Sequence, residues 1–168
     1  MSRTLPAPTR LSVVSPTAFD PTGAILSADA SENSAAVIDR ARVEKRLTND
    51  SYAAALGIRL TDVSEDSLTV AMTVTDQLTN FHGATHGGAV FSLADCALSL
   101  YANAYPEDAS AIDTHMVFSA GSRSGDELTA TAAEIHRGRT LATYRILVRR
   151  TDGKVIGHFT GTVYINRT

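Results

Sequence analysis

Residues 87–104, GGAVFSLADCALSLYANA, constrain the fold of this chain more than any other segment. The segment is apolar over almost its whole length and too long for a strand, so we expect a buried helix that stops before Pro106. A helix that is apolar on nearly every side must be covered on nearly every side. A curved antiparallel sheet wrapped around it is the simplest structure that gives such cover.

The segments on both sides of this helix have the pattern of strands. Apolar residues alternate with polar ones at 58–63 and 68–74, around a Ser64-Glu65-Asp66 turn, which predicts a hairpin. After the helix, turns that contain Gly or Asp separate four more predicted strands, at about 110–119, 126–137, 140–150 and 154–166. The fold class is therefore α+β, with about six antiparallel strands around one long central helix.

The N-terminal part of the chain differs from the rest. Residues 1–33 are rich in Pro, Ser, Thr and Ala without a sustained period, which predicts a flexible or loosely docked extension. From Ser34 to about Leu56, apolar residues recur every three or four positions, and residues 49–51 interrupt them, so we expect two short helices. We therefore expect a single domain at 34–168 that includes these helices.

Composition limits the class of protein. Of the 168 residues, 43% are hydrophobic and 20% are charged, and the net charge of -3 argues against nucleic acid or an acidic membrane as a partner. The single cysteine, Cys96, excludes an internal disulfide. No apolar run is long enough to span a bilayer, and the N-terminus lacks the features of a secretory signal. These observations predict a cytoplasmic protein.

The predicted helix carries a polar stripe. Ser92, Asp95 and Ser99 are three and four positions apart, so they share one face. An ionised carboxylate without a partner in a dry core is costly, so Asp95 is paired, solvated in a cleft, or protonated. A purely structural role, with Asp95 hydrogen-bonded to a neighbouring strand, is one alternative. A catalytic carboxylate is the other.

The approach to the helix favours catalysis. The loop before it is dense in polar residues and leads into two glycines: Asn80, His82, Thr85, His86, Gly87 and Gly88. The glycines leave backbone N–H groups open to a closely approaching ligand. Because a helix N-terminus with open donors can hold a carbonyl oxygen that becomes negative during reaction, we expect an oxyanion hole here.

This oxyanion hole and Asp95 cannot act on the same carbon from within one chain. Gly87 and Asp95 are eight positions apart, or about 12 Å along a helix, whereas both groups must lie about 3 Å from a reacting atom. Two helices packed antiparallel about a two-fold axis would place Asp95 of one chain near the glycines of the other. The spacing therefore predicts an obligate dimer with two composite sites.

The loop before the predicted helix and the helix itself resemble the motif of a known family. Asn80-x-His82 followed by HGGAVFSLAD at 86–95 resembles the motif of hotdog-fold acyl-CoA thioesterases, most closely the hydroxyphenylacetyl-CoA (PaaI-type) branch. The later segments SGDELTATAAEIHRGRT and DGKVIGHFTGTVYI are similar to the same branch. The resemblance covers about residues 50–166. It implies the hotdog fold and thioester hydrolysis, and it is poor at naming the acyl group.

The resemblance also implies roles for individual residues. Asp95 matches the family's nucleophile or general base, and the N–H of Gly87 matches the group that polarises the thioester carbonyl, with help from the His86 side chain. Asn80 matches the residue that orients water or substrate. Ser99 is a candidate for the extra hydroxyl that some relatives place near the carboxylate, because the strand serine of another branch falls on Ala111 here.

The resemblance further implies how an acyl-CoA would bind. The pantetheine arm would follow the dimer interface past Gly88, with a small or aromatic acyl group between the two helices, against residues such as Phe91, Leu98 and Tyr101. Arg137 and Arg139 either pair with the coenzyme A phosphates or are solvated turn residues. Two dimers would associate into a homotetramer.

No metal or redox cofactor is implied, since coenzyme A is part of the substrate. His82 and His86 have a spacing that suits a metal on a helix, but Gly83 and the loop context argue against it. The sequence GSRSG at 121–125 has Arg123 where a serine hydrolase would have its nucleophile. Two alternatives stay open: an acyl-thioester dehydratase on the same fold, and a non-catalytic acyl-CoA-binding protein.

Overall fold

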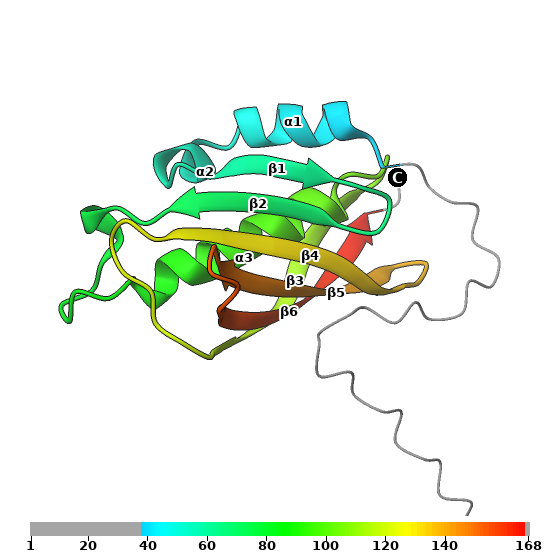
Figure 1. The fold of residues 1–168 in the computed structure, drawn as a ribbon. Helices are drawn as coiled ribbons and strands as arrows, with labels where there is room; N and C mark the ends of the chain where they lie inside the picture. Colours follow the sequence, from blue (N-terminus) through cyan, green and yellow to red (C-terminus); the bar gives the residue numbers. More distant parts are fainter. Residues whose placement is uncertain (1–37, 167–168) are drawn as a thin grey trace, which may run out of the picture. The chain divides into compact units, whose positions relative to one another are not determined.

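The computed structural model describes residues 38–166, in which one long helix lies against a six-stranded antiparallel sheet (Figure 1). The predicted extension at 1–33 lies outside the described residues. The elements are α1 (Arg40–Thr48), α2 (Ser51–Ala55), β1 (Arg59–Val63), β2 (Leu68–Thr73), the short 3-10 helix η1 (Asp76–Leu78), α3 (Gly87–Ala102), β3 (Asp108–Phe118), β4 (Glu127–Arg137), β5 (Leu141–Arg150) and β6 (Val155–Asn166). The predicted α+β class is confirmed.

The strand order is β1-β2-β4-β5-β6-β3, so β1 and β3 are the two edges of the sheet. Helix α1 packs along β1 and covers that edge (Figure 1). The outer edge of β3 pairs with no other strand between residues 38 and 166. Three large apolar side chains of β3, those of Ile112, Val117 and Phe118, are exposed. One edge of the sheet is therefore open, and it is apolar.

The core lies between α3 and the sheet. Leu93, Ala97 and Leu98 of α3 are fully buried, and so is Phe159 of β6. A side chain at Gly161 would put its Cβ 2.5 Å from Leu98 Cδ2, so glycine is needed there to let the helix approach the sheet. Burial of a leucine side chain such as that of Leu98 contributes about 2 kcal/mol.

The break between α1 and α2 has a local cause. Asp39 caps α1 by accepting from the N–H of Arg42, and Asp50 caps α2 by accepting from the N–H groups of Tyr52 and Ala53. Because Asp50 is extended (φ -89°, ψ 97°), as an N-cap residue is, the first helix cannot continue through it. The predicted pair of short helices is confirmed.

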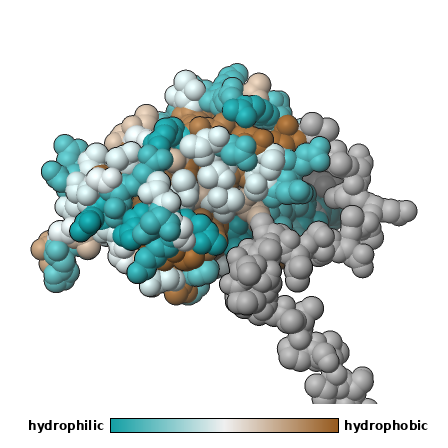
Figure 2. All heavy atoms as spheres, in the orientation of Figure 1, coloured by the Kyte–Doolittle hydropathy of each residue, from teal (hydrophilic) through white to brown (hydrophobic). Residues whose placement is uncertain are grey.

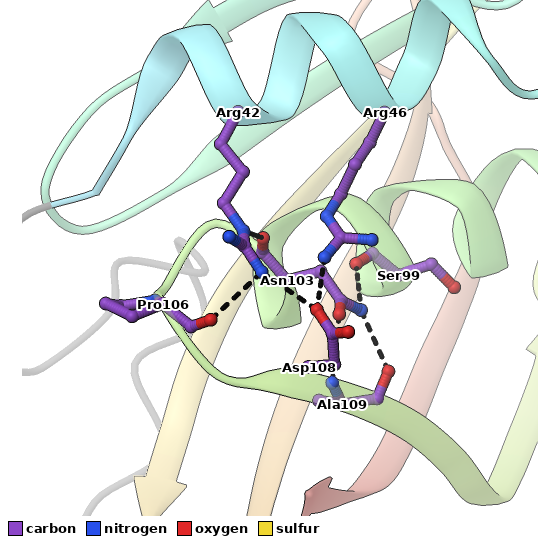
Figure 3. A network of polar contacts seen from close by, with 7 residues as sticks. All are labelled: Arg42, Arg46, Ser99, Asn103, Pro106, Asp108 and Ala109. Atoms are coloured by element: carbon purple, nitrogen blue, oxygen red, sulfur yellow. Dashed lines mark hydrogen bonds and ion pairs between the residues drawn. The ribbon is translucent and has the colours of Figure 1, made fainter. Parts of the chain in front are cut away.

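Helix α1 is tied to the end of α3 and the start of β3 by a polar network (Figure 3). Arg42 donates to the carbonyl oxygens of Asn103 (3.1 Å) and Pro106 (3.0 Å) and to Asp108 Oδ1 (2.8 Å). Arg46 pairs with the same carboxylate oxygen. The Asn103 amide bridges the carbonyl oxygens of Ser99 (3.0 Å) and Ala109 (2.9 Å). Helix α1 is therefore fastened beside α3.

On the face drawn in Figure 2, hydrophilic residues cover much of the surface, and apolar residues gather in a band beside α1. None of the helices between residues 38 and 166 is long and apolar enough to cross a membrane.

Candidate active site

The N-terminus of α3 exposes one backbone donor. His86 is the N-cap residue, and its Nδ1 accepts a hydrogen bond from the N–H of Gly88 at 2.9 Å. The N–H groups of Ala89 and Val90 reach the His86 carbonyl oxygen at 2.9 and 3.4 Å. The N–H of Gly87 has no partner among residues 38–166. Of the four N–H groups in the first turn, Gly87 therefore has the one that is open to a ligand.

The loop before α3 is held by its own side chains. Asn80 Oδ1 accepts from the N–H groups of His82 (2.9 Å) and Ala84 (3.3 Å). Thr85 is buried and its hydroxyl lies 2.6 Å from that of Ser122. Asn80 thus shapes the loop through its oxygen, and its Nδ2 makes no hydrogen bond within the described residues. This nitrogen is the part of Asn80 that is free to contact water or substrate.

Asp95 lies two turns along the same helix and is half-buried. Burial raises the pKa of its carboxyl above the ordinary value of 3.8. No neighbouring strand within residues 38–166 donates a hydrogen bond to the carboxylate. The structural alternative, in which a strand satisfies Asp95, therefore has no support in the described contacts.

Phe118 was not among the residues that the sequence singled out. A Cβ added to Gly87 would lie 3.2 Å from Phe118 Cζ, so the ring stands directly beside the open N–H. Phe118 ends the open edge strand β3, and 55% of its surface is exposed. No sequence signal links the two positions, because their contact depends on how β3 crosses the start of α3.

A cleft of about 480 Å³ lies between α3 and the pair α1–α2. The wall that α3 contributes consists of Cys96, Ser99, Leu100 and Asn103, so the predicted candidate Ser99 faces this space. Burial, and then the negative charges of Asp50 and Asp95, raise the pKa of the Cys96 thiol to about 12. The thiol therefore stays protonated and neutral, and both carboxylates lie near it.

Two residues expected to contact the acyl group lie elsewhere. Leu98 and Tyr101 are 0% and 1% exposed and face the sheet, and the Tyr101 hydroxyl donates to the Glu65 carbonyl oxygen at 3.1 Å. The expected contact with the acyl group is not met in this chain, because both side chains are packed in the core between α3 and the sheet. Phe91 is partly buried, with its ring edge-on to Phe159 at 5.2 Å.

The two candidate phosphate-binding arginines differ. Arg137 donates to Glu134 (2.8 Å) and to the Tyr144 hydroxyl (2.5 Å), and its guanidinium stacks on Tyr105 at 3.8 Å. Arg139 is exposed in the turn between β4 and β5. The guanidinium of Arg137 is thus engaged inside the protein, and Arg139 is the one that solvent reaches. Within residues 38–166, no group of three His, Cys, Asp or Glu side chains is placed to hold a metal ion.

Comparison with known proteins gives this arrangement a context. The sequence model of the Thioesterase superfamily matches residues 82–156 of this chain. A protein of Deinococcus radiodurans is 48% identical over 114 residues, which cover 67% of this chain and 77% of the relative. The acyl-coenzyme A thioesterase PaaI of Escherichia coli is 38% identical over 113 residues, which cover 67% of this chain and 81% of the relative.

The solved structure of the PaaI protein from the phenylacetic acid degradation operon of Escherichia coli has a TM-score of 0.73 to this chain. The two are 34% identical, over 76% of this chain and 92% of the other. Sheet, central helix and matches together define a hotdog-fold thioesterase. Within that class, the chain belongs to the Thioesterase superfamily and is of the PaaI type. The resemblance and the predicted hydrolase activity are confirmed.

Proposed function

We propose that this thioesterase hydrolyses an acyl-CoA to the free acid and coenzyme A in sites that two protomers share. The observation that carries the proposal is the single open N–H of Gly87 on the same helix as the half-buried Asp95. The Gly87 N–H can donate a hydrogen bond to a developing oxyanion, and the Asp95 carboxylate can act as a base or nucleophile. Since about 12 Å of helix separates them, two chains are needed to bring such a pair together.

The open edge of the sheet supports a dimer. An edge strand with exposed apolar side chains invites pairing with another strand, and β3 presents Ile112, Val117 and Phe118. A second copy of β3 would satisfy the unpaired backbone groups about a two-fold axis. Because Phe118 also contacts the start of α3, the same edge would bring the partner chain next to the Gly87 N–H.

The reaction would proceed by acyl transfer to water. The Gly87 N–H of one protomer polarises the thioester carbonyl. The Asp95 carboxylate of its partner either removes a proton from the attacking water or attacks the carbonyl carbon itself, in which case water then cleaves the mixed anhydride and frees the carboxylate. The C–S bond breaks, the sulfur leaves as the thiolate of coenzyme A, and the oxygen of water ends in the acid. His86 keeps Gly88 bonded and so leaves Gly87 as the donor.

The substrate would be a small or aromatic acyl-CoA, in line with the phenylacetic acid degradation operon from which the Escherichia coli PaaI protein comes. Arg139 is exposed and is our candidate for a coenzyme A phosphate, whereas Arg137 would have to give up its contacts with Glu134 and Tyr144. A tetramer made of two dimers and a cytoplasmic location remain predictions.

The direct test is thiol release from a panel of acyl-CoA esters by the wild type and by Asp95→Asn. We expect release by the wild type and a loss of 100-fold or more, on the order of a general-base contribution, in the variant. Hydration of an enoyl thioester without thiol release would favour the dehydratase. Binding of acyl-CoA without any turnover would favour the binding protein.

A further inference from the structure

The cleft between α3 and α1–α2 is polar on both sides. Arg46 of α1, the linking residues Asn49 and Asp50, and Ser51 of α2 form the wall opposite the α3 residues described above. Both helices lie outside residues 82–156, which are the residues that match the sequence model of the Thioesterase superfamily. A space walled by a guanidinium, an amide and hydroxyl groups is a poor place for a plain alkyl chain, because the chain would displace water from polar groups without replacing their hydrogen bonds.

Arg46 gives this cleft a positive end. Arg42 and Arg46 both pair with the single carboxylate of Asp108, so the three side chains carry one surplus positive charge. Figure 3 shows Arg46 reaching from α1 toward Ser99 and Asn103 at the end of α3. Its Nε is buried and has no hydrogen-bond partner among residues 38–166. The Arg46 guanidinium is thus only partly satisfied by the protein.

Asp50, the one acid in the cleft wall, is already committed. Its Oδ1 accepts from the N–H groups of Tyr52 (3.0 Å) and Ala53 (2.9 Å), which cap α2. The carboxylate keeps its negative charge, which the Cys96 thiol experiences, so a ligand carboxylate is favoured only where it lies nearer to Arg46 than to Asp50. Arg46 is the one cation in the cleft wall among residues 38–166.

The cleft also lies next to the proposed reaction centre. Cys96, which lines the cleft, follows Asp95 directly in the sequence. Ser99, which also lines it, lies one helical turn beyond Asp95, or about 6 Å along the helix. The thiol of Cys96 experiences the charges of both Asp50 and Asp95, so both carboxylates lie near it. An acyl group whose thioester carbon lies at Asp95 can therefore extend along α3 toward Arg46.

We propose that this cleft receives the far end of the acyl group and that Arg46 selects acyl groups that end in a carboxylate, the mono-CoA esters of dicarboxylic acids. The inference rests on the proposed function. A carboxylate only accepts hydrogen bonds, and a guanidinium only donates them, so the pair is matched in charge and in hydrogen bonding. Asn49 and Ser99 add further donors to the wall of the cleft.

The test compares adipoyl-CoA with hexanoyl-CoA, two esters of equal carbon number that differ in a terminal carboxylate or methyl group. We expect the wild type to favour adipoyl-CoA by about 10-fold or more in kcat/KM. Arg46→Met should lower kcat/KM for adipoyl-CoA by about 10- to 100-fold, the range for a hydrogen bond to a charged group. Turnover of hexanoyl-CoA should change little, and Arg46→Lys should restore part of the preference.

Arg40→Met is the matched control. Arg40 is an exposed arginine of the same helix that pairs with Glu44 and does not line the cleft, so its loss should leave the adipoyl-to-hexanoyl ratio unchanged. Equal turnover of the two esters by the wild type, or an equal loss for both in Arg46→Met, would overturn the inference and leave thioester hydrolysis standing. Should Arg46→Met not fold, the wild-type ratio alone decides. Absence of thiol release from every acyl-CoA would instead overturn the proposed function.

Discussion

The Nδ1 atom of His86 accepts a hydrogen bond from the N–H of Gly88 at 2.9 Å, so a ring nitrogen caps the central helix. Since Nδ1 is the acceptor, the neutral ring carries its proton on Nε2. The same bond uses the Gly88 donor and leaves the Gly87 N–H for a ligand. His86 thus has a physical role at the helix N-terminus whether or not its ring also contacts the substrate.

Removing this cap should weaken both the fold and the activity. For His86→Ala we expect the free energy of unfolding to fall by about 1 kcal/mol, as for the loss of other N-caps. We also expect kcat to fall about 10-fold, because the first turn of α3 loses its alignment. Urea denaturation and thiol release measure the two effects. His82→Ala is the control, since His82 is exposed and its ring lies beside that of Phe81; equal effects of the two variants would contradict a capping role.

The Gly87 donor can be removed with little other change. Gly87 is the first residue of α3, a position where proline is well tolerated, and the extended conformation of His86 (φ -64°, ψ 133°) suits a residue before proline. We expect Gly87→Pro to melt near the wild-type temperature and to lose about 100- to 1,000-fold in kcat, the cost of one oxyanion donor. Gly87→Ala keeps the N–H and only moves the exposed Phe118 ring slightly, so it should lose much less. Similar losses in both variants would count against the donor role.

Asp95 should lower stability at neutral pH. Its pKa is raised in the folded protein, so the unfolded chain loses the proton first as the pH rises above 3.8, and stability then falls until the folded pKa is passed. Asp95→Asn should therefore raise Tm at pH 7, and this gain should shrink as the pH is lowered toward 3.8. Calorimetry of both proteins across this range measures the difference. A variant that is less stable than the wild type at pH 7 would contradict the burial argument.

The open edge of β3 predicts how the dimer can be broken. Ile112 is 60% exposed on this strand, and a lysine there would place a buried, unpaired charge in any interface formed by β3. For Ile112→Lys we expect a monomer in sedimentation and at least 100-fold lower thiol release, with an unchanged far-ultraviolet spectrum. The control Thr160→Lys changes an exposed residue of the interior strand β6. Dimeric, active Ile112→Lys would place the interface elsewhere.

The sequence predicted the parts of this protein that depend on periodicity. The long apolar run could only be a covered helix, and the alternating segments gave the strands to within about two residues. The acyl contacts at Leu98 and Tyr101 were misjudged because apolar character alone does not tell the core face of a helix from its open face. Helical spacing does not supply the missing information, because Leu98 and Ser92 are each three positions from Asp95, yet Leu98 is fully buried and Ser92 is not.

Contacts between residues that are far apart in the chain could not be predicted from the sequence. The contact between Phe118 and Gly87 depends on the path of an edge strand, and the pairing of Arg42 and Arg46 with Asp108 joins residues more than 60 positions apart. A charged residue in a short amphipathic helix is usually solvated, so nothing in the sequence marks Arg46 as part of a binding site. Only the packing of α1 beside α3 turns it into the wall of a cleft.

Complementation between two inactive variants tests the shared site most directly. Heterodimers of Asp95→Asn and Gly87→Pro chains, purified through two different tags, contain one site with both defects and one with neither if each site takes Asp95 and Gly87 from different chains. Such heterodimers should then regain about half of the wild-type activity, while each homodimer stays inactive. Heterodimers as inactive as both homodimers would show that the two groups act within one chain, which contradicts the account.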